Sequence, residues 1–360
     1  MKDSMITLKE VAEIAGVSST TVANVLHGRK NRVSADTYEK VNKILKDMNY
    51  VSNMGGRIIN KSGSRIIAII VAYDRFRNVC QSSEIDPFCG AIVGAIEKEI
   101  TKYNYFVMLY ASSDIEKCLN MALAWNVEGI ILLGAKRKLY YLLHSRLDIP
   151  IVTIDTCFKK QDRNYINIGL EDEKGGYEIT KYLIENGHKN IMFAELEPQD
   201  DENGILNIDE ARKRGYERAL SENGLDKGLE DSSTKFLKLD LDIETRENQL
   251  VELVNNRFNN CSAIFFASDL LAVEAMNVFF DNGIKVPEDI SVVGFDDSII
   301  SRKIRPGLTT VRQDIIEKGK KSVENIMQII NGEYNKKNDY INVQLPIKVI
   351  KRQTVLNLNE

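Results

Sequence analysis

Three small polar side chains, Ser19, Thr20 and Asn24, share one face of a short helix predicted near the start of the 360-residue chain. Hydroxyl and amide groups can hydrogen-bond the edges of DNA bases, and asparagine pairs well with adenine. A helix that contacts protein would instead expose aromatic or aliphatic anchors. Basic residues suited to DNA phosphates follow at Arg29 and Arg32. The pattern therefore predicts a surface that reads a DNA sequence.

The elements that position these groups are two short helices joined by a glycine turn. Thr7 and Glu10 have the spacing of a capping box, in which each side chain satisfies a backbone N–H at the helix start. Ser18 is placed to cap the second helix, and Ser34 caps a third helix predicted at about 35–48. This order predicts a helix-turn-helix, whose second helix lies in the major groove.

Charge is divided unevenly along the chain. The formal net charge is −4, but residues 1–65 contain 11 Lys and Arg against 6 Asp and Glu, so this segment is +5 and the remainder −9. Such asymmetry is expected when one small module binds DNA. The five cysteines form no C-x-x-C pair, the N-terminus has no signal-peptide pattern, and no run approaches the ~20 apolar residues of a membrane span. We therefore expect a cytoplasmic protein.

From residue 65 onward, short apolar runs alternate with amphipathic helices. The predicted strands cover residues 66–71, 106–110, 129–133 and 151–154, and then 191–194, 263–266 and 291–295. Continuous Ile and Val runs that alternate with helices predict parallel sheets covered on both faces. Two such sets predict two α/β lobes with a cleft between them, in which ligands bind at the carboxyl ends of the strands.

Several motifs extend over almost the whole chain. They are V-A-x-x-A-G-V-S-x-x-T-V-x-x-V-L at 11–26, I-P-I-V-T-I-D at 149–155, L-I-E-N-G-H at 183–188, R-K-R-G-Y at 212–216 and a long run at 283–297. Together they resemble the lactose-repressor (LacI/GalR) family of bacterial transcription regulators. The resemblance implies an all-α helix-turn-helix domain, a hinge linker and a periplasmic-binding-protein-like, two-lobed α/β effector domain with parallel sheets, which also dimerises.

The resemblance also implies boundaries for these parts. The DNA-binding domain is expected at 1–50, the hinge linker at 51–63 and the effector domain at 64–360. The expected bounds of lobe 1 are about 65–167 and 298–332, and those of lobe 2 are about 168–297 and 333–360.

In that family the linker folds into a hinge helix on DNA, and an apolar side chain wedges into the minor groove. Asn53 and Arg57 match the family pattern, and Ile59 lies where the wedge is expected. Gly55 and Gly56 replace better helix formers at roughly 1 kcal/mol each, so we expect a hinge that is unfolded off DNA. A plain flexible tether is the alternative. The full set expected to contact DNA is Thr7, Ser18, Ser19, Thr20, Thr21, Asn24, His27, Arg29, Arg32, Asn53, Arg57 and Ile59.

The effector contacts implied by the resemblance are Phe88, Asp155, Arg212, Ser268, Asp269 and Asp296. A carboxylate accepts sugar hydroxyls and a guanidinium donates a planar fork, so Asp155, Arg212 and Asp296 suit a polyhydroxylated ligand. A structural ion pair is the alternative for Asp296 and Arg212, and core packing is the alternative for Phe88.

These observations predict a sequence-specific DNA-binding transcriptional regulator, a repressor controlled by a small effector of the sugar class. One helix-turn-helix reads one half-site, so we expect a homodimer on a near-palindromic operator, associated with the nucleoid when bound. The sequence has no P-loop, G-x-S-x-G or H-E-x-x-H motif, and its three histidines form no metal-spaced cluster. We therefore expect no enzyme activity, metal or cofactor. A solute-binding protein without DNA binding is the alternative, and an unrecognised hydrolase built on the cleft is a remote one.

Overall fold

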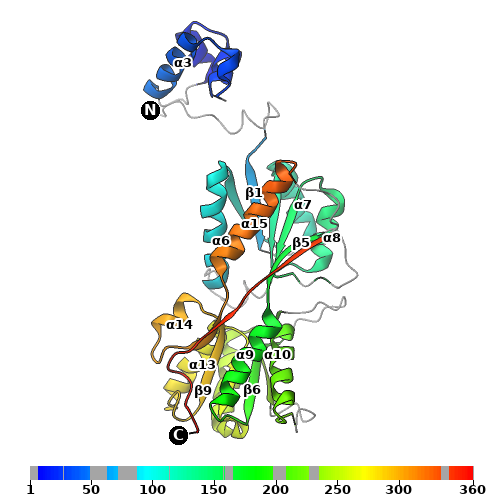
Figure 1. The fold of residues 1–360 in the computed structure, drawn as a ribbon, viewed down its shortest axis with the longest axis vertical. Coiled ribbons are helices and arrows are strands. Elements are labelled where there is room, and N and C mark those ends of the chain that lie inside the picture. Colours follow the sequence, from blue (N-terminus) through cyan, green and yellow to red (C-terminus); the bar gives the residue numbers. More distant parts are fainter. Residues whose placement is uncertain are drawn as a thin grey trace. The chain divides into compact units, whose positions relative to one another are not determined.

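The computed structural model describes residues 7–26, 28–48, 63–71, 87–112, 114–156, 158, 165–197, 208–226, 235–333 and 340–359. The chain forms two compact units, Met1–Ser64 and Arg65–Glu360 (Figure 1). Within the described ranges, no helix is long and apolar enough to cross a membrane.

The N-terminal unit is a bundle of short helices. Its elements are α1 (Leu8–Ala15), α2 (Ser19–Leu26), the 3-10 turn η1 (Lys30–Arg32) and α3 (Ala35–Asp47). Val11, Val22 and Val41, one from each α-helix, are fully buried against one another in a single core. The predicted helix-turn-helix order is confirmed.

The predicted start and end of α1 are also confirmed. The Glu10 backbone N–H donates to Thr7 Oγ1 at 3.3 Å, and the Thr7 backbone N–H donates to Glu10 Oε2 at 2.6 Å. Gly16 follows with φ = 65°, a left-handed conformation that glycine adopts without steric cost. The sharp turn fixes the direction in which α2 leaves α1.

Two six-stranded sheets form the C-terminal unit. The first has the order β11-β5-β4-β3-β1-β2 and the second β12-β10-β9-β8-β6-β7. All neighbours are parallel except β12, which pairs antiparallel with β10. The strands of the first sheet are β1 (Ile66–Val71), β2 (Phe106–Ala111), β3 (Gly129–Leu133), β4 (Ile151–Ile154), β5 (Tyr165–Leu170) and β11 (Tyr340–Leu345). Those of the second are β6 (Ile191–Leu196), β7 (Phe236–Leu239), β8 (Ala263–Phe266), β9 (Ser291–Asp296), β10 (Thr309–Arg312) and β12 (Lys348–Ile350).

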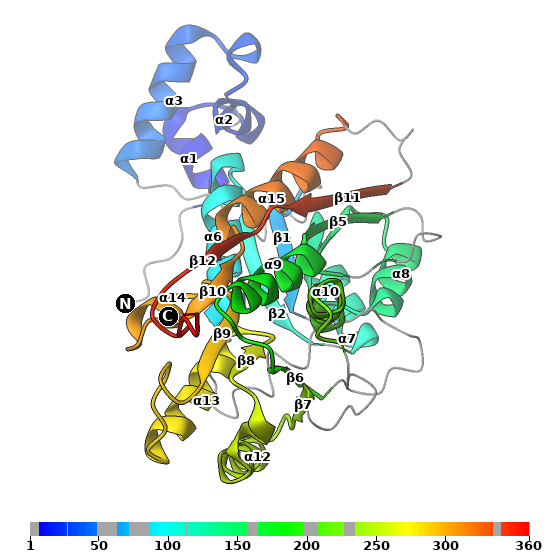
Figure 2. The same ribbon diagram turned by 60° about the horizontal axis from the view of Figure 1, so that its bottom comes forward.

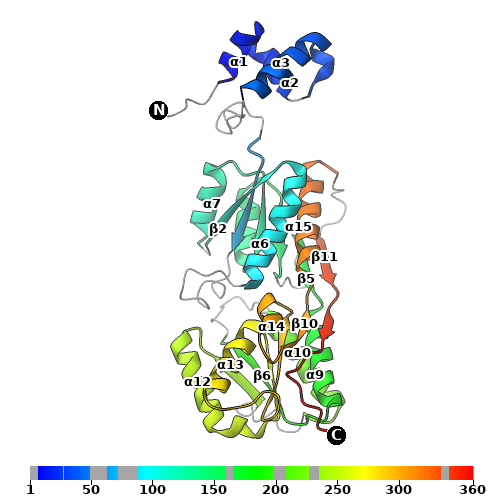
Figure 3. The same ribbon diagram turned by 90° about the vertical axis from the view of Figure 1, so that its left-hand side faces the viewer.

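Helices cover both faces of each sheet, as the continuous apolar runs predict. In the first lobe, α6 (Pro87–Ile100) and α15 (Ile315–Ile330) lie side by side on one face of the sheet (Figure 3). Ile67 and Ile69 of β1 belong to the core on this face. On the face of Ala68 and Ile70 lie α7 (Ile115–Ala124) and α8 (Arg137–Arg146). Successive side chains of a strand point to opposite faces, so β1 supplies both cores.

The second lobe repeats this arrangement. Its helices are α9 (Asp172–Glu185) and α10 (Ile208–Glu222) on one face, and α12 (Ile243–Asn255) and α13 (Asp269–Asp281) on the other. The remaining elements are the short α14 (Ile299–Lys303) and the 3-10 turns η2 (Thr101–Tyr103) and η3 (Arg257–Asn260). The α/β fold with two parallel-dominated sheets is therefore confirmed.

The chain passes between the lobes three times, after β5, after β10 and after β11 (Figure 2). These positions correct the expected lobe bounds. β5 belongs to the first sheet up to residue 170, residues 309–312 belong to the second sheet, and residues 340–345 return to the first. The expectation was wrong there because hydrophobic periodicity does not specify strand pairing: β10 pairs with β9 and β12, and β11 pairs with β5, which lies 175 positions earlier in the chain.

Candidate functional site

Side chains suited to DNA contact lie at the start of α2. Ser19 and Thr20 are exposed, and Asn24 is half-buried. The hydroxyls of Ser18 and Thr21 lie 2.9 Å apart, and the Thr21 backbone N–H donates to Ser18 Oγ at 3.1 Å. These two residues therefore fix the start of the helix, and Ser19, Thr20 and Asn24 extend from it as candidates for base contact.

Basic side chains follow α2 on the same unit. Arg29 and Arg32 are exposed, and the Lys30 ammonium lies 5.6 Å from the centroid of the Tyr38 ring. Thr7 is held by Glu10 in the capping box described above. The expected DNA contacts that lie outside the described residues are His27, Asn53, Arg57 and Ile59.

In the first lobe, the buried Asp155 carboxylate at the end of β4 binds a buried lysine. Lys318 Nζ donates to Asp155 Oδ1 at 2.8 Å, to Asp155 Oδ2 at 2.9 Å and to Gln313 Oε1 at 2.7 Å. The Lys318 side chain is only 1% exposed and lies 5.3 Å from the centroid of the Phe88 ring. Phe88 lies on α6 and packs in the hydrophobic core, so its ring contacts both core side chains and the Lys318 ammonium.

Gln313 hydrogen-bonds residues of both lobes. It lies in the crossover between β10 of the second lobe and α15 of the first. Its amide oxygen accepts from Lys318, and its Nε2 donates to Asp296 Oδ1 at 2.7 Å. Asp155 and Asp296 have φ values of 54° and 125°, left-handed conformations that cost of order 1–3 kcal/mol and concentrate at functional sites.

In the second lobe, the Arg212 guanidinium is held on three sides. Its Nε donates to Asp172 Oδ1 at 2.9 Å, its Nη1 donates to the Ala267 carbonyl at 2.6 Å, and its Nη2 lies 3.8 Å from Asp296 Oδ1. Its face lies 3.6 Å from the centroid of the Phe295 ring. Burial raises the pKa of the Asp172 carboxyl, although the Arg212 charge opposes this shift.

Two glycines hold α9 and α10 close enough for this arrangement. A methyl group added at Gly176 would lie 2.0 Å from the Arg212 carbonyl oxygen, and one added at Gly215 would lie 2.0 Å from that of Glu173. Only glycine allows the two helix backbones to approach this closely. The contact therefore fixes the position of Arg212 on α10 relative to Asp172 on α9.

We call Asp155, Lys318, Gln313, Asp296, Arg212 and Asp172 the interlobe cluster. Its members form one chain of contacts from the first lobe to the second, at or beside the carboxyl ends of β4 and β9. Three expected effector contacts, Asp155, Arg212 and Asp296, are thus brought together. Sequence reasoning did not identify Lys318 or Gln313, although the Lys318 position on the buried face of an amphipathic helix is a signal that could have indicated it.

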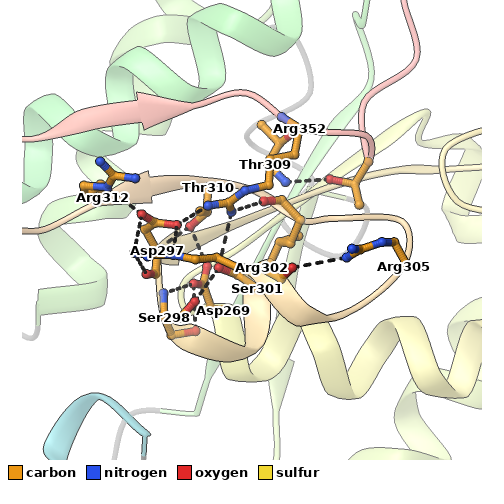
Figure 4. Close-up of polar contacts among 12 residues, drawn as sticks. Asp269, Asp297, Ser298, Ser301, Arg302, Arg305, Thr309, Thr310, Arg312 and Arg352 are labelled. Carbon is orange, nitrogen blue, oxygen red and sulfur yellow. Dashed lines mark hydrogen bonds and ion pairs between the residues drawn. The ribbon is translucent and has the colours of Figure 1, made fainter. Parts of the chain in front are cut away.

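Ser268 and Asp269 have structural contacts in the second lobe. Ser268 Oγ accepts from the Leu271 backbone N–H at 3.4 Å and so caps α13. Asp269 is fully buried and accepts from the Ser298 backbone N–H at 2.7 Å, from Ser298 Oγ and from Thr310 Oγ1 (Figure 4). Burial raises the pKa of Asp269 to about 6. These contacts fasten the segment that follows β9.

Asp297, next to Asp296, binds three arginines (Figure 4). Arg302 Nη2 donates at 2.9 Å, and Arg312 and Arg352 also donate to this carboxylate. Burial acts to raise the pKa of Asp297, but the three guanidinium hydrogen bonds outweigh it and hold the pKa below its ordinary value. The arginines anchor Asp297 on one side of the strand end, while Asp296 contacts Arg212 and Gln313.

The interlobe cluster offers charged hydrogen-bond donors and acceptors from both lobes, which suits a polar ligand. Among the described residues, no group of three or more His, Cys, Asp and Glu side chains could hold a metal ion.

Comparisons with known proteins agree with the two units. Residues 7–53 match the model "Bacterial regulatory proteins, lacI family", and residues 180–355 match the model "Periplasmic binding protein-like domain". The HTH-type transcriptional repressor PurR of Vibrio atlanticus (strain LGP32) is 30% identical over 369 residues, which cover 99% of this chain and 100% of that protein.

Solved structures show the same fold over nearly the full length. The Lac repressor dimer bound to operator and the anti-inducer ONPF has a TM-score of 0.79 at 24% identity, covering 98% of this chain and 100% of that one. The transcriptional regulator CelR–cellobiose complex has a TM-score of 0.68 at 25% identity, covering 97% of this chain and 99% of that one. With a helix-turn-helix unit, a two-lobed α/β unit and a full-length repressor relative, the chain belongs to the LacI family of DNA-binding transcription regulators.

Proposed function

We propose that this regulator is a homodimeric repressor that binds a near-palindromic operator and responds to a sugar or sugar derivative at the interlobe cluster. Each N-terminal unit reads one half-site through Ser19, Thr20 and Asn24, while Arg29 and Arg32 contact phosphates. The C-terminal unit carries the ligand site and the dimer contacts. The protein acts in the cytoplasm, where its operator is, and has no catalytic role of its own.

The observation that carries this proposal is the path of contacts through Gln313. Asp155 and Lys318 belong to one lobe, Asp296 and Arg212 to the other, and the Gln313 amide hydrogen-bonds both sets from a crossover. A ligand that competes for these hydrogen bonds changes the relative stability of lobe arrangements. Such coupling is typically 1–3 kcal/mol and is reciprocal, so operator DNA changes ligand affinity by the same factor.

Two similar solved structures support the proposed partners, which are operator DNA and a sugar. The Lac repressor dimer was solved on operator DNA, and CelR was solved with cellobiose. The match of residues 7–53 to the lacI family model disfavours a solute-binding protein that lacks DNA binding.

Selection of bound sequences from a random duplex pool tests the DNA-binding part. We expect an enriched inverted repeat with a fixed centre-to-centre spacing of its half-sites, because a symmetric dimer places two recognition helices at a set distance. Enriched half-sites without fixed spacing would contradict the dimer, and no enrichment would contradict operator binding.

The selected operator then tests the ligand part. Asp296→Ala removes the carboxylate that contacts both Arg212 and Gln313, so we expect loss of the sugar response with operator affinity unchanged. Glu288→Ala, an exposed carboxylate of the same lobe, is the matched control and should leave the response intact. Loss of operator binding in Asp296→Ala would assign this residue to folding instead.

A further inference from the structure

The chain enters the C-terminal unit through two backbone conformations of the left-handed region. Gly63 and Arg65 have φ values of 78° and 54°, and β1 begins at the next residue, Ile66. An arginine rarely adopts a positive φ. Such a conformation persists where the surrounding structure imposes it, so the contacts of Arg65 show what fixes the chain at this point.

Glu128, the residue before β3, supplies two of these contacts. Its Oε1 accepts from the Arg65 backbone N–H at 2.7 Å, and its own backbone N–H donates to the Ile66 carbonyl at 2.8 Å. From the β2 side, the Phe106 backbone N–H donates to the Arg65 carbonyl at 2.8 Å. Both the N–H and the carbonyl of Arg65 are therefore held, each by a different neighbour of β1.

Tyr105, the residue before β2, completes the arrangement. Its hydroxyl donates to Glu128 Oε2 at 2.6 Å, and both side chains are half-buried. Burial and this hydrogen bond raise the pKa of Tyr105 above its ordinary value, so the phenol stays a donor. Because β1 lies between β2 and β3 in the sheet, the bond links the two strands that flank the entering chain. We call Arg65, Tyr105 and Glu128 the entry cluster.

The entry cluster acts on residues that precede the strand ladders. The pairing of β1 with β2 begins at Ile66, and its pairing with β3 begins at Ile67, so Arg65 lies before both. The first residues of a domain are poorly ordered unless they are tied down. A carboxylate that binds the Arg65 N–H therefore fixes the direction of the segment before β1, and that segment leads to the N-terminal unit.

We propose that Glu128 is a positioning residue for operator recognition, which fixes how the chain enters each C-terminal unit and so limits the half-site spacing that the dimer accepts. The inference rests on the proposed homodimeric repressor. In a symmetric dimer, the C-terminal units set the distance between the two Arg65 residues, and the entry cluster holds each of them in one conformation. Without Glu128, the segment before β1 samples more directions, and each DNA-binding unit reaches more positions.

Operators that differ only in spacing test the inference on the full chain. One base pair is added or removed between the half-sites of the selected inverted repeat, which moves one half-site by about 3.4 Å and rotates it by about 35°. We expect the parent chain to bind the selected spacing roughly tenfold tighter than either altered spacing. Glu128→Ala should reduce this ratio at least about threefold and leave the affinity for a single half-site unchanged, because the DNA-reading surface of α2 is intact. Fluorescence anisotropy measures all these affinities.

Further variants grade the effect. Tyr105→Phe removes only the hydroxyl and keeps the contact of Glu128 with Arg65, so it should reduce the ratio less than Glu128→Ala does. Glu128→Gln keeps an oxygen acceptor for the Arg65 N–H and should restore most of the parent ratio. Glu116→Ala is the control, because Glu116 is an exposed carboxylate on α7, beyond the carboxyl end of β2, and it should leave the ratio unchanged.

The ratio distinguishes positioning from a contribution to stability alone. Loss of folded protein or of dimer weakens binding to every spacing together and leaves the ratio unchanged. A parent-like ratio in both Glu128→Ala and Tyr105→Phe, with both folded by circular dichroism, would overturn the inference, as would a parent chain that binds all three spacings equally. If the selection enriches no inverted repeat, the proposed dimeric operator binding is contradicted and the inference falls with it.

Discussion

The Asp155–Lys318 ion pair provides a quantitative test of the fold around the interlobe cluster. Lys318→Met keeps the apolar stem of a side chain that is 1% exposed and removes the ammonium that both Asp155 oxygens contact. Breaking a buried ion pair from one side costs about 3–5 kcal/mol, because it leaves a buried charge without compensation. At about 2 °C per kcal/mol for a unit of this size, we expect the C-terminal unit to melt roughly 6–10 °C lower.

The double variant Asp155→Asn/Lys318→Met distinguishes the cost of leaving one charge unpaired from the effect of replacing the side chains themselves. Asparagine tolerates the positive φ of 54° at residue 155, so the substitution removes charge without adding backbone strain. Replacing both members of a buried pair is often neutral or stabilising, so we expect the double variant to melt within about 1 kcal/mol of the parent chain. Differential scanning calorimetry of the full chain measures all variants.

A matched control lies on the same helix. Lys320 is 44% exposed and pairs with Glu317 and Glu324 at 3.8 and 3.6 Å, so Lys320→Met should cost less than about 1 kcal/mol. The reasoning is refuted if Lys318→Met melts like this control. It is also refuted if the stability lost in the double variant equals the sum of the losses in Asp155→Asn and Lys318→Met measured separately. Losses of stability add at independent sites but not at residues that interact.

Three further predictions concern the DNA face, the contact between α9 and α10, and the buried His188, whose Nε2 lies 3.0 Å from the Leu356 carbonyl oxygen near the C-terminus. Asn24→Ala should weaken binding to the selected operator by about 1–3 kcal/mol but leave binding to unrelated duplex unchanged, whereas Arg29→Ala should weaken both and lower the salt slope by about one. Fluorescence anisotropy checks this, and equal losses in Asn24→Ala on both duplexes would contradict base contact. Gly215→Ala forces a methyl group against the Glu173 carbonyl and should destabilise the unit by about 1–3 kcal/mol and weaken sugar binding, whereas Gly90→Ala, with open space around it, should be neutral or stabilising. Calorimetry distinguishes the two variants, and similar melting would show that α9 and α10 can separate freely. Burial lowers the pKa of His188, so the unfolded chain binds its proton more readily, and the stability that His188 contributes is present above about pH 6.5 and is lost as pH falls below it. The slope of melting temperature against pH between 7 and 5 should therefore flatten in His188→Gln, and an unchanged slope would assign it to other groups.

Local signals were sufficient to predict most of the N-terminal unit. The capping box of Thr7 and Glu10, the stop at Gly16 and the cap at Ser34 each depend on residues within three or four positions of one another, and all are present. The strands that were predicted are those with uninterrupted apolar runs, most of which, such as β1 and β3, are buried on both faces, whereas β5, whose apolar run is interrupted by Asn167 and Gly169, was not predicted although it is fully buried. Interactions and patterns among residues close in sequence are therefore sufficient to predict these helix ends and these strands.

Long-range pairing explains what the sequence did not predict. Lys318 and Asp155 are 163 residues apart, and a lysine on an otherwise apolar helix face gives no indication of which carboxylate neutralises it. Glu195 interrupts an apolar strand in the same way. The assignment of residues 309–312 to the second lobe depends on pairing with β9, which hydrophobic periodicity alone does not specify.

The late position of α15, β11 and β12 has a consequence for synthesis on the ribosome. Asn342 of β11 pairs with Asn167 of β5, which lies 175 positions earlier in the chain, and this stretch takes roughly 10–35 s to translate. During that interval the edge of β5 that will pair with β11 has no neighbour, and the part of the apolar sheet face that α15 later covers through residues such as Ile326 is open. Unpaired edges and exposed apolar faces promote aggregation. Slow translation, or truncation before residue 345, should therefore cause aggregation mainly through the first lobe. The need for chaperones should depend on how soon α15 and β11 are synthesised rather than on the DNA-binding unit.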